Sequence, residues 1–107
     1  MALVLIVDDS PTDVHVMQQA LEQHGFRTAA AADGGEGLRL ARELHPDLIL
    51  MDLNMPGANG IELTALIREQ EAYAHTPIVF LSGESSEDLQ FDAIDAGGDD
   101  FLSKPIR

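Results

Sequence analysis

Short apolar runs alternate with stretches of helical periodicity along this chain, and that alternation limits the fold more than any other feature. Apolar runs of four or five residues begin at Leu3, Leu48 and Ile78, which is the length of a buried strand. Between them, apolar residues recur every three or four positions, as on one face of a helix. Parallel neighbours in a sheet need crossover connections, so this order predicts an α/β domain with helices on both sides of a parallel sheet. With 107 residues, one domain over residues 1–107 is expected.

Turn and capping residues set the limits of the predicted elements. Strands are expected at 3–7, 27–31, 48–51, 78–81 and 101–102, and helices at 11–24, 34–45, 61 to about 73, and 85–96. Ser10 is suited to cap the first helix, with Pro11 at its first position and Gly25 at its end. Asp33 to Glu36 resembles a capping box for the second helix, which must stop before Pro46.

The charge balance excludes several classes of function. Six basic residues stand against 19 acidic ones, and the net charge is −13. Direct binding to nucleic acid or to an anionic membrane is therefore not expected, because phosphate contacts need clustered Lys and Arg. The chain has no cysteine, which excludes disulfides, zinc–thiolate sites and thiol catalysis. Since Met1 leads directly into the first strand, we expect no signal peptide, no membrane span and a cytoplasmic location.

Polar residues stand where the predicted strands end. Asp8 and Asp9 follow the first strand, Asp52 the third, Ser82 the fourth and Lys104 the fifth. Ligands of parallel α/β sheets bind at the carboxyl ends of the strands, so these side chains are expected to converge. Converging carboxylates repel one another, and a cation must offset that repulsion unless one acid stays protonated. Oxygen ligands without imidazole or thiolate favour Mg²⁺, with Mn²⁺ as the alternative.

The same five residues have the chemistry that phosphoryl transfer needs. Its transition state spreads negative charge over oxygens, which the Lys104 ammonium, the Ser82 hydroxyl and backbone N–H groups can stabilise. A carboxylate at Asp52 can act as the nucleophile and become an aspartyl phosphate. Formation of that high-energy bond can drive a conformational change.

Four segments, taken in order, closely resemble the receiver domain of two-component response regulators. They are Val7-Asp8-Asp9-Ser10, Leu50 to Gly57 around Asp52, Leu81-Ser82-Gly83, and Asp99 to Pro105. The resemblance implies a doubly wound, flavodoxin-like sheet of five strands in the order 2-1-3-4-5. It also implies that a histidine kinase or a histidine phosphotransfer protein phosphorylates Asp52.

The resemblance implies a role for each matching residue. Asp9, Asp52 and the backbone carbonyl of Asn54 would bind Mg²⁺, and Asp8 would act through water. Lys104 would contact the phosphoryl group, while Ser82 and the aromatic Phe101 would form the switch. Asn54 and Glu84 match the positions that tune dephosphorylation, and a cis peptide is expected at Lys104-Pro105. Because both tuning residues are polar, we expect a short to moderate phosphoryl lifetime.

Two alternatives and one departure from the family accompany this interpretation. A phosphohydrolase of the haloacid dehalogenase type also uses a strand-end Asp, but it needs Asp-x-Asp where this chain has Asp52-Leu53-Asn54. A pseudo-receiver would serve only as a binding surface. The family's fifth helix is absent after Lys104-Pro105, so we expect a receiver domain truncated before that helix and forming the N-terminal part of a longer regulator. Homodimerisation or domain exchange could cover the face left bare.

Overall fold

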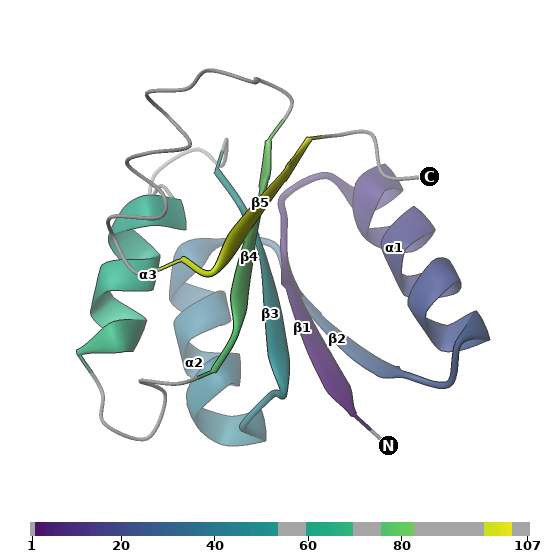
Figure 1. The fold of residues 1–107 in the computed structure, drawn as a ribbon, viewed down its shortest axis with the longest axis horizontal. Helices are drawn as coiled ribbons and strands as arrows, with labels where there is room; N and C mark the ends of the chain where they lie inside the picture. Colours follow the sequence, from purple (N-terminus) through teal and green to yellow (C-terminus); the bar gives the residue numbers. More distant parts are fainter. Residues whose placement is uncertain (1, 54–59, 70–75, 83–97, 104–107) are drawn as a thin grey trace.

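The computed structural model describes residues 2–53, 60–69, 76–82 and 98–103, in which five parallel strands form one sheet (Figure 1). Along the chain the elements are β1 (Leu3–Val7), α1 (Pro11–Gln23), β2 (Arg27–Ala31), α2 (Gly34–Leu44), β3 (Leu48–Asp52), α3 (Gly60–Arg68), β4 (Ile78–Ser82) and β5 (Asp100–Ser103). The spatial order is β2-β1-β3-β4-β5, and every neighbouring pair is parallel. The predicted fold class and strand order are confirmed.

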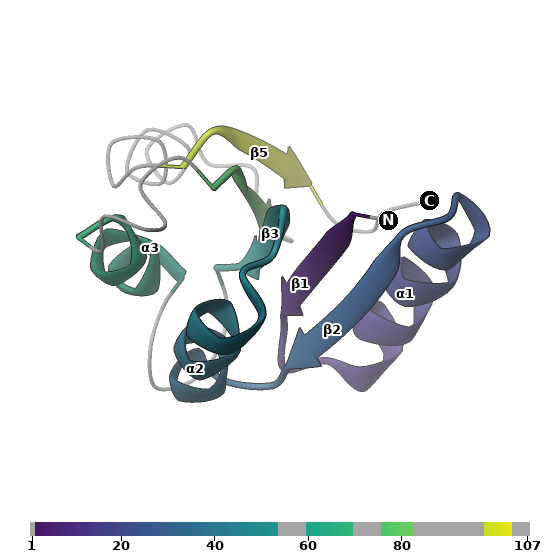
Figure 2. The same ribbon diagram turned by 90° about the horizontal axis from the view of Figure 1, so that it is seen from below.

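Helices cover both faces of the sheet, with α1 on one side and α2 and α3 on the other (Figure 2). Alternating side chains of β1 explain this arrangement, because successive residues of a strand point to opposite faces. Val4 and Ile6 pack in the cluster that contains Met17 of α1. Leu5 and Val7 pack in the larger cluster on the other face. A continuous apolar run is thus what a strand between two helical layers requires.

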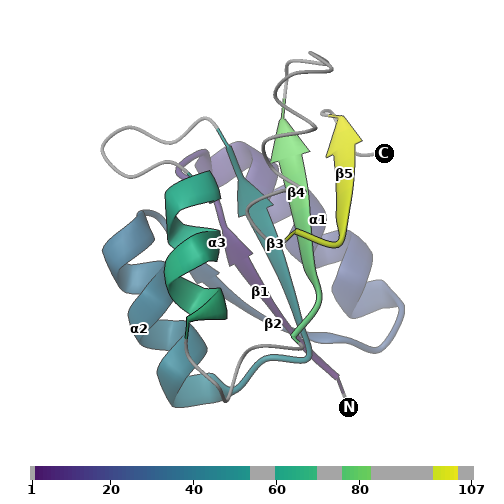
Figure 3. The ribbon, with the colours of Figure 1, turned by 60° about the vertical axis from the view of Figure 1, so that its left-hand side comes forward.

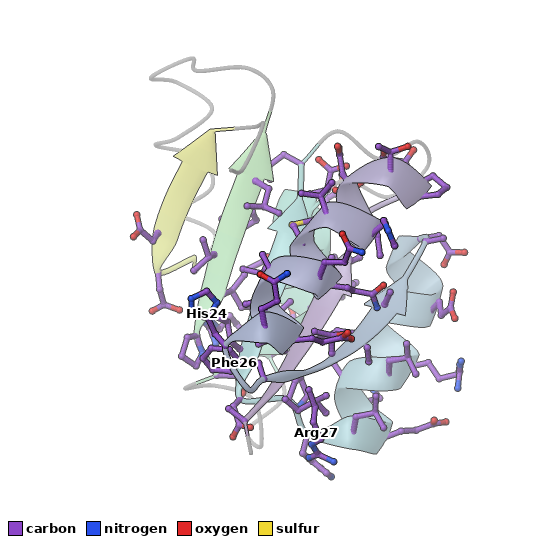
Figure 4. The ribbon with its side chains drawn as sticks, turned by 90° about the vertical axis from the view of Figure 1, so that its right-hand side faces the viewer. His24, Phe26 and Arg27 are labelled. Carbon is purple, nitrogen blue, oxygen red and sulfur yellow. The ribbon has the colours of Figure 1, made fainter. Side chains whose placement is uncertain are left out.

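Helix α1 has the predicted N-cap, and its C-cap lies one residue before the predicted Gly25. The Ser10 hydroxyl accepts a hydrogen bond from the Asp13 N–H at 3.3 Å, and Pro11 opens the helix. At the other end the cap is His24, and Gly25 follows with a φ of +88°. The Gly25 N–H donates to the Glu22 carbonyl and the Phe26 N–H donates to the Leu21 carbonyl, which is the Schellman pattern. Figure 4 shows His24, Phe26 and Arg27 at this turn into β2.

Helix α2 also begins as predicted. The Asp33 carboxylate accepts from the Glu36 N–H at 2.8 Å. At the other end, His45 is the cap, and its φ of 48° lies in the left-handed region, which ends the helix just before Pro46. Non-glycine residues rarely adopt this conformation.

The structure corrects the prediction for the third helix. Helix α3 ends at Arg68, earlier than the expected end near residue 73. The Arg68 side chain donates to the Thr76 carbonyl at 2.6 Å, which places the end of α3 beside the residues that precede β4. The predicted fourth helix and the Lys104-Pro105 peptide lie outside the described residues. In the part of the chain that is described, no helix has the length and apolar character needed to cross a membrane.

Candidate functional site

The carboxyl ends of the parallel strands meet at one edge of the sheet (Figure 3). Val7 pairs with Met51, so Asp8, which directly follows β1, comes next to Asp52, the last residue of β3. Asp9 follows Asp8 in the turn that leads to α1. Register along the sheet therefore brings together acids that are more than forty positions apart in sequence.

The three carboxylates form a compact cluster. Asp8, Asp9 and Asp52 each offer an oxygen, and these oxygens all lie within 4.8 Å of one another. Asp8 and Asp52 are each 2% exposed, whereas Asp9 is exposed to solvent. Two buried acids and one exposed acid form a site that is open on one side. Burial strengthens the repulsion between the acids because the local dielectric constant is lower than that of water.

Backbone hydrogen bonds fix the position of Asp8. Its N–H donates to the Ala31 carbonyl at 3.0 Å, which ties it to the end of β2. Its Oδ1 accepts from the Ser10 N–H at 2.9 Å. Ser10 is also the N-cap of α1, so the same turn holds the acid and starts the helix.

Strand β4 brings Ser82 to the same edge. Asp52 pairs with Leu81, and the Leu53 N–H donates to the Leu81 carbonyl at 3.0 Å. Ser82 is the next residue of β4, and it pairs with Ser103 of β5. Phe101 lies within β5, where it pairs with Phe80.

Several predicted site residues cannot be placed from the described part of the chain. Asn54, Glu84 and Lys104 lie outside it, and the backbone alone is described for Ser82 and Phe101. The expectations for these five residues stay predictions.

The donor set fits a hard divalent cation. Three carboxylates and no imidazole or thiolate supply oxygen ligands, which Mg²⁺ prefers over softer donors. Mg²⁺ keeps several waters and takes few protein ligands, so a cluster that is open on one side suits it. The fit rests on the carboxylates themselves, which the fold brings within contact of one ion.

A cavity that the sequence did not reveal lies beside the acids. It has a volume of about 250 Å³, and its lining consists of Asp8, Asp9, Pro11, Val14, Glu36 and residues 30–32. Residues 30–32 are three successive alanines, whose small side chains leave room between the end of β2 and the start of α1. Glu36 thus adds a fourth acid near the cluster. The three alanines were the available signal, but small residues in a strand are too common to predict a cavity.

The family of response regulator receiver domains matches residues 4–107, nearly the whole chain. Among curated proteins, Protein PilH of Pseudomonas aeruginosa is 37% identical over 106 residues, which are 99% of this chain and 88% of PilH. The DNA-binding response regulator MtrA of Mycolicibacterium smegmatis is 36% identical over 97% of this chain. This chain spans only 44% of the length of MtrA.

Solved structures agree with the sequence comparison. The chemotaxis protein CheY4 of Vibrio cholerae has a TM-score of 0.96 and 36% identity, covering 100% of this chain and 89% of CheY4. A response regulator protein from Burkholderia multivorans is 41% identical, with a TM-score of 0.82, and the match covers 100% of this chain and 86% of that protein. Three observations agree on one family: the fold, the acids at the carboxyl ends of the strands, and the matches over nearly the full chain. The chain belongs to the family of response regulator receiver domains.

Proposed function

We propose that this domain accepts a phosphoryl group on Asp52 from a histidine kinase or a histidine phosphotransfer protein, and that phosphorylation switches its conformation. The observation that carries the proposal is the cluster of Asp8, Asp9 and Asp52 at the carboxyl edge of the sheet. A buried carboxylate that faces two others can take up a charged group only where a cation offsets the total charge. Phosphoryl transfer with a divalent cation meets that requirement.

Asp52 is the best candidate for the nucleophile among the three acids. Asp8 already accepts the Ser10 N–H with Oδ1, which favours a fixed supporting role. Asp9 is exposed, so bulk water would hydrolyse an acyl phosphate on it readily. Asp52 is buried at the end of a central strand, where a desolvated carboxylate is more reactive and its product better protected. One Asp52 oxygen would bond to phosphorus while the bond from phosphorus to the donor imidazole breaks, and that imidazole, which carries a proton on its other nitrogen, leaves as a neutral ring.

All three acids would help to hold the cation. Asp9, Asp52 and the Asn54 backbone carbonyl would bind Mg²⁺ directly, and Asp8 would do so through water. When bound, Mg²⁺ would neutralise charge on the acids and on the phosphoryl oxygens. The open side of the cluster at Asp9 leaves a path for the phosphodonor.

The other strand-end residues would sense the new group. Lys104 would pair with a phosphoryl oxygen, and the Ser82 hydroxyl would donate to another. The backbone register that brings Ser82 next to the end of β3 supports this role. Phe101, one strand further, would follow the movement of Ser82 as the switch aromatic. Asn54 and Glu84 would set the access of the hydrolytic water.

The domain would pass its signal on through contacts with protein. Its net charge of −13 argues against contact with DNA by this segment itself. The relatives that it matches include PilH, which is little longer than this chain, and DNA-binding regulators more than twice as long. The haloacid dehalogenase alternative gains no support from these matches, which are to signalling domains.

Labelling with acetyl phosphate tests the proposal. The wild-type chain should take up about one phosphoryl group per molecule with Mg²⁺ and none with EDTA, because the acids alone repel an anion. Asp52→Asn should abolish the label. The matched control is Asp47→Asn, which changes an acid at the opposite end of β3 and keeps an oxygen for the Leu3 N–H.

Three results would contradict the proposed function. Undiminished labelling of Asp52→Asn would place the phosphoryl group elsewhere. Absence of label in the wild-type chain would favour a pseudo-receiver. Repeated turnover of small phosphate esters would restore the phosphohydrolase alternative.

A further inference from the structure

An ion pair joins three elements at the amino ends of the strands, the end of the sheet opposite the acids. Arg68, in the last turn of α3, donates from Nη2 to Asp99 Oδ2 at 2.8 Å and from Nη1 to the Thr76 carbonyl at 2.6 Å. Asp99 directly precedes β5, and Thr76 lies just before β4. One guanidinium therefore connects α3 to the beginnings of the last two strands.

Asp99 is also bonded to β4 itself. Its Oδ2 accepts from the Ile78 N–H at 2.8 Å, and its own N–H donates to the Ile78 carbonyl at 2.8 Å. These two bonds lead directly into the ladder in which Val79 pairs with Asp100. The Arg68 guanidinium holds the Asp99 carboxylate, which accepts the bond from the Ile78 N–H.

Strand β5 needs such a constraint more than the other strands do. It has four residues, and among the described strands it is an edge strand that pairs with β4 alone. A short edge strand has few ladder bonds to specify its register, and a slip by one residue turns every side chain to the other face. Such a slip would also move the end of the strand by about 3.3 Å.

We propose that Arg68 and Asp99 are positioning residues for the phosphoryl site, acting by fixing the register of β5 on β4. This inference rests on the proposed function. Ser82 ends β4 and Lys104 follows β5. The Arg68–Asp99 pair therefore fixes the two strands that lead to the hydroxyl of Ser82 and the ammonium of Lys104. The acids stand at the ends of β1 and β3, which the pair does not touch within the described residues. The pair should therefore govern phosphoryl transfer without governing cation binding.

Stability alone is a weak explanation for this ion pair. The Arg68 side chain is 17% exposed, but that of Asp99 is 55% exposed, so solvent screens the pair and limits what the charges add to the free energy of unfolding. Arg39 on α2 provides the comparison. It pairs with Glu43 at 3.1 Å and Glu36 at 3.8 Å within one helix, so it does not connect two strands.

The test compares Arg68→Met with Arg39→Met, which removes the same group from a pair within one helix. Two quantities are measured on folded protein, the Kd for Mg²⁺ by titration calorimetry and the labelling rate from acetyl phosphate at saturating Mg²⁺. Arg68→Met should label roughly tenfold to a hundredfold more slowly, the effect expected of misplaced catalytic groups. Its Kd for Mg²⁺ should stay within about twofold of wild type, since the metal-binding acids keep their positions. Arg39→Met should change neither quantity, and Arg68→Lys should recover part of the rate because it keeps one donor.

Two outcomes would overturn the proposal. A labelling rate equal to wild type would show that the pair does not position the site. A rate and a Kd that worsen together would show general loosening of the fold instead. If Arg68→Met does not fold, Asp99→Ala carries the same expectations, because it removes the oxygen that accepts from both Arg68 Nη2 and the Ile78 N–H and leaves the backbone bond to the Ile78 carbonyl in place.

A third measurement separates this proposal from the proposed function. Amide hydrogen exchange of β5 should be faster in Arg68→Met than in Arg39→Met, whether or not the protein is phosphorylated. Loss of wild-type labelling would sink the proposed function, whereas equal exchange rates in the two variants would sink the register argument.

Discussion

Asp8→Asn should make the metal-free protein more stable. The substitution removes one of three negative charges whose oxygens lie within 4.8 Å of one another, and it keeps Oδ1 for the Ser10 N–H. At this distance two unit charges repel by about 3.5 kcal/mol at an effective dielectric constant of about 20, and by about 0.9 kcal/mol at that of water. The first value applies to buried Asp52 and the second to exposed Asp9.

The expected net gain is smaller than the sum of these terms. Carboxylate charge is shared between two oxygens, and the rest of the chain already compensates part of it. We expect an increase of about 2 kcal/mol in the free energy of unfolding in EDTA, which is roughly 10 °C in Tm for a domain of this size. Asp47→Asn, remote from the cluster, should leave Tm nearly unchanged.

Magnesium should reduce this advantage without cancelling it. A ligand that binds only the folded state stabilises it by about 2.7 kcal/mol at one hundred times its Kd. The wild-type protein should gain that amount, whereas Asp8→Asn should bind Mg²⁺ about tenfold more weakly and gain less. Thermal melts in EDTA and over a series of Mg²⁺ concentrations measure both effects. A variant that melts at or below the wild-type temperature in EDTA would refute the repulsion argument, and equal gains with Mg²⁺ would refute the cation site.

Three further predictions concern the scaffold, each measured by urea unfolding. A Cβ at Gly37 would lie 3.0 and 3.1 Å from the two methyl carbons of Val7, so Gly37→Ala should lose about 1–2 kcal/mol. Gly35→Ala, where the nearest atom is 3.5 Å away, should instead gain up to about 1 kcal/mol, and the same sign for both would contradict the packing. The buried Thr64 hydroxyl has no hydrogen-bond partner among the described residues, so Thr64→Val should be neutral or stabilising by about 1 kcal/mol, and a large loss would reveal a partner. His45→Gly should gain about 0.5–1 kcal/mol by removing a side chain from a left-handed position, and a loss would mean that the ring contributes more than the strain costs.

Local patterns predicted the parts of this fold that depend on local chemistry. The apolar run at Leu3 to Val7 and the cap at Ser10 fixed β1 and the start of α1 to the residue. The meeting of Asp8 and Asp52 was also predictable, because parallel strands end at a common edge.

Features that depend on contacts between distant segments were not predictable. Arg68 and Asp99 are 31 positions apart, and neither belongs to a periodic pattern that indicates a partner. The predicted end of α3 was wrong, and the contact that its last residue, Arg68, makes with Thr76 is equally invisible in the local pattern. The cavity beside Glu36 likewise depends on how closely α1 approaches β2, which alanines alone do not specify.

The hydrogen bond from Ser10 to Asp8 has a consequence for the thermodynamics of cation binding. Because the bond is present without a cation, the Asp8 side chain has already lost rotamer freedom when the protein folds. Binding therefore incurs little further loss of conformational entropy on this side of the site. The folding reaction supplies the order that the ion would otherwise have to impose, and a preorganised site of this kind leaves dehydration of the ion as the main cost of binding.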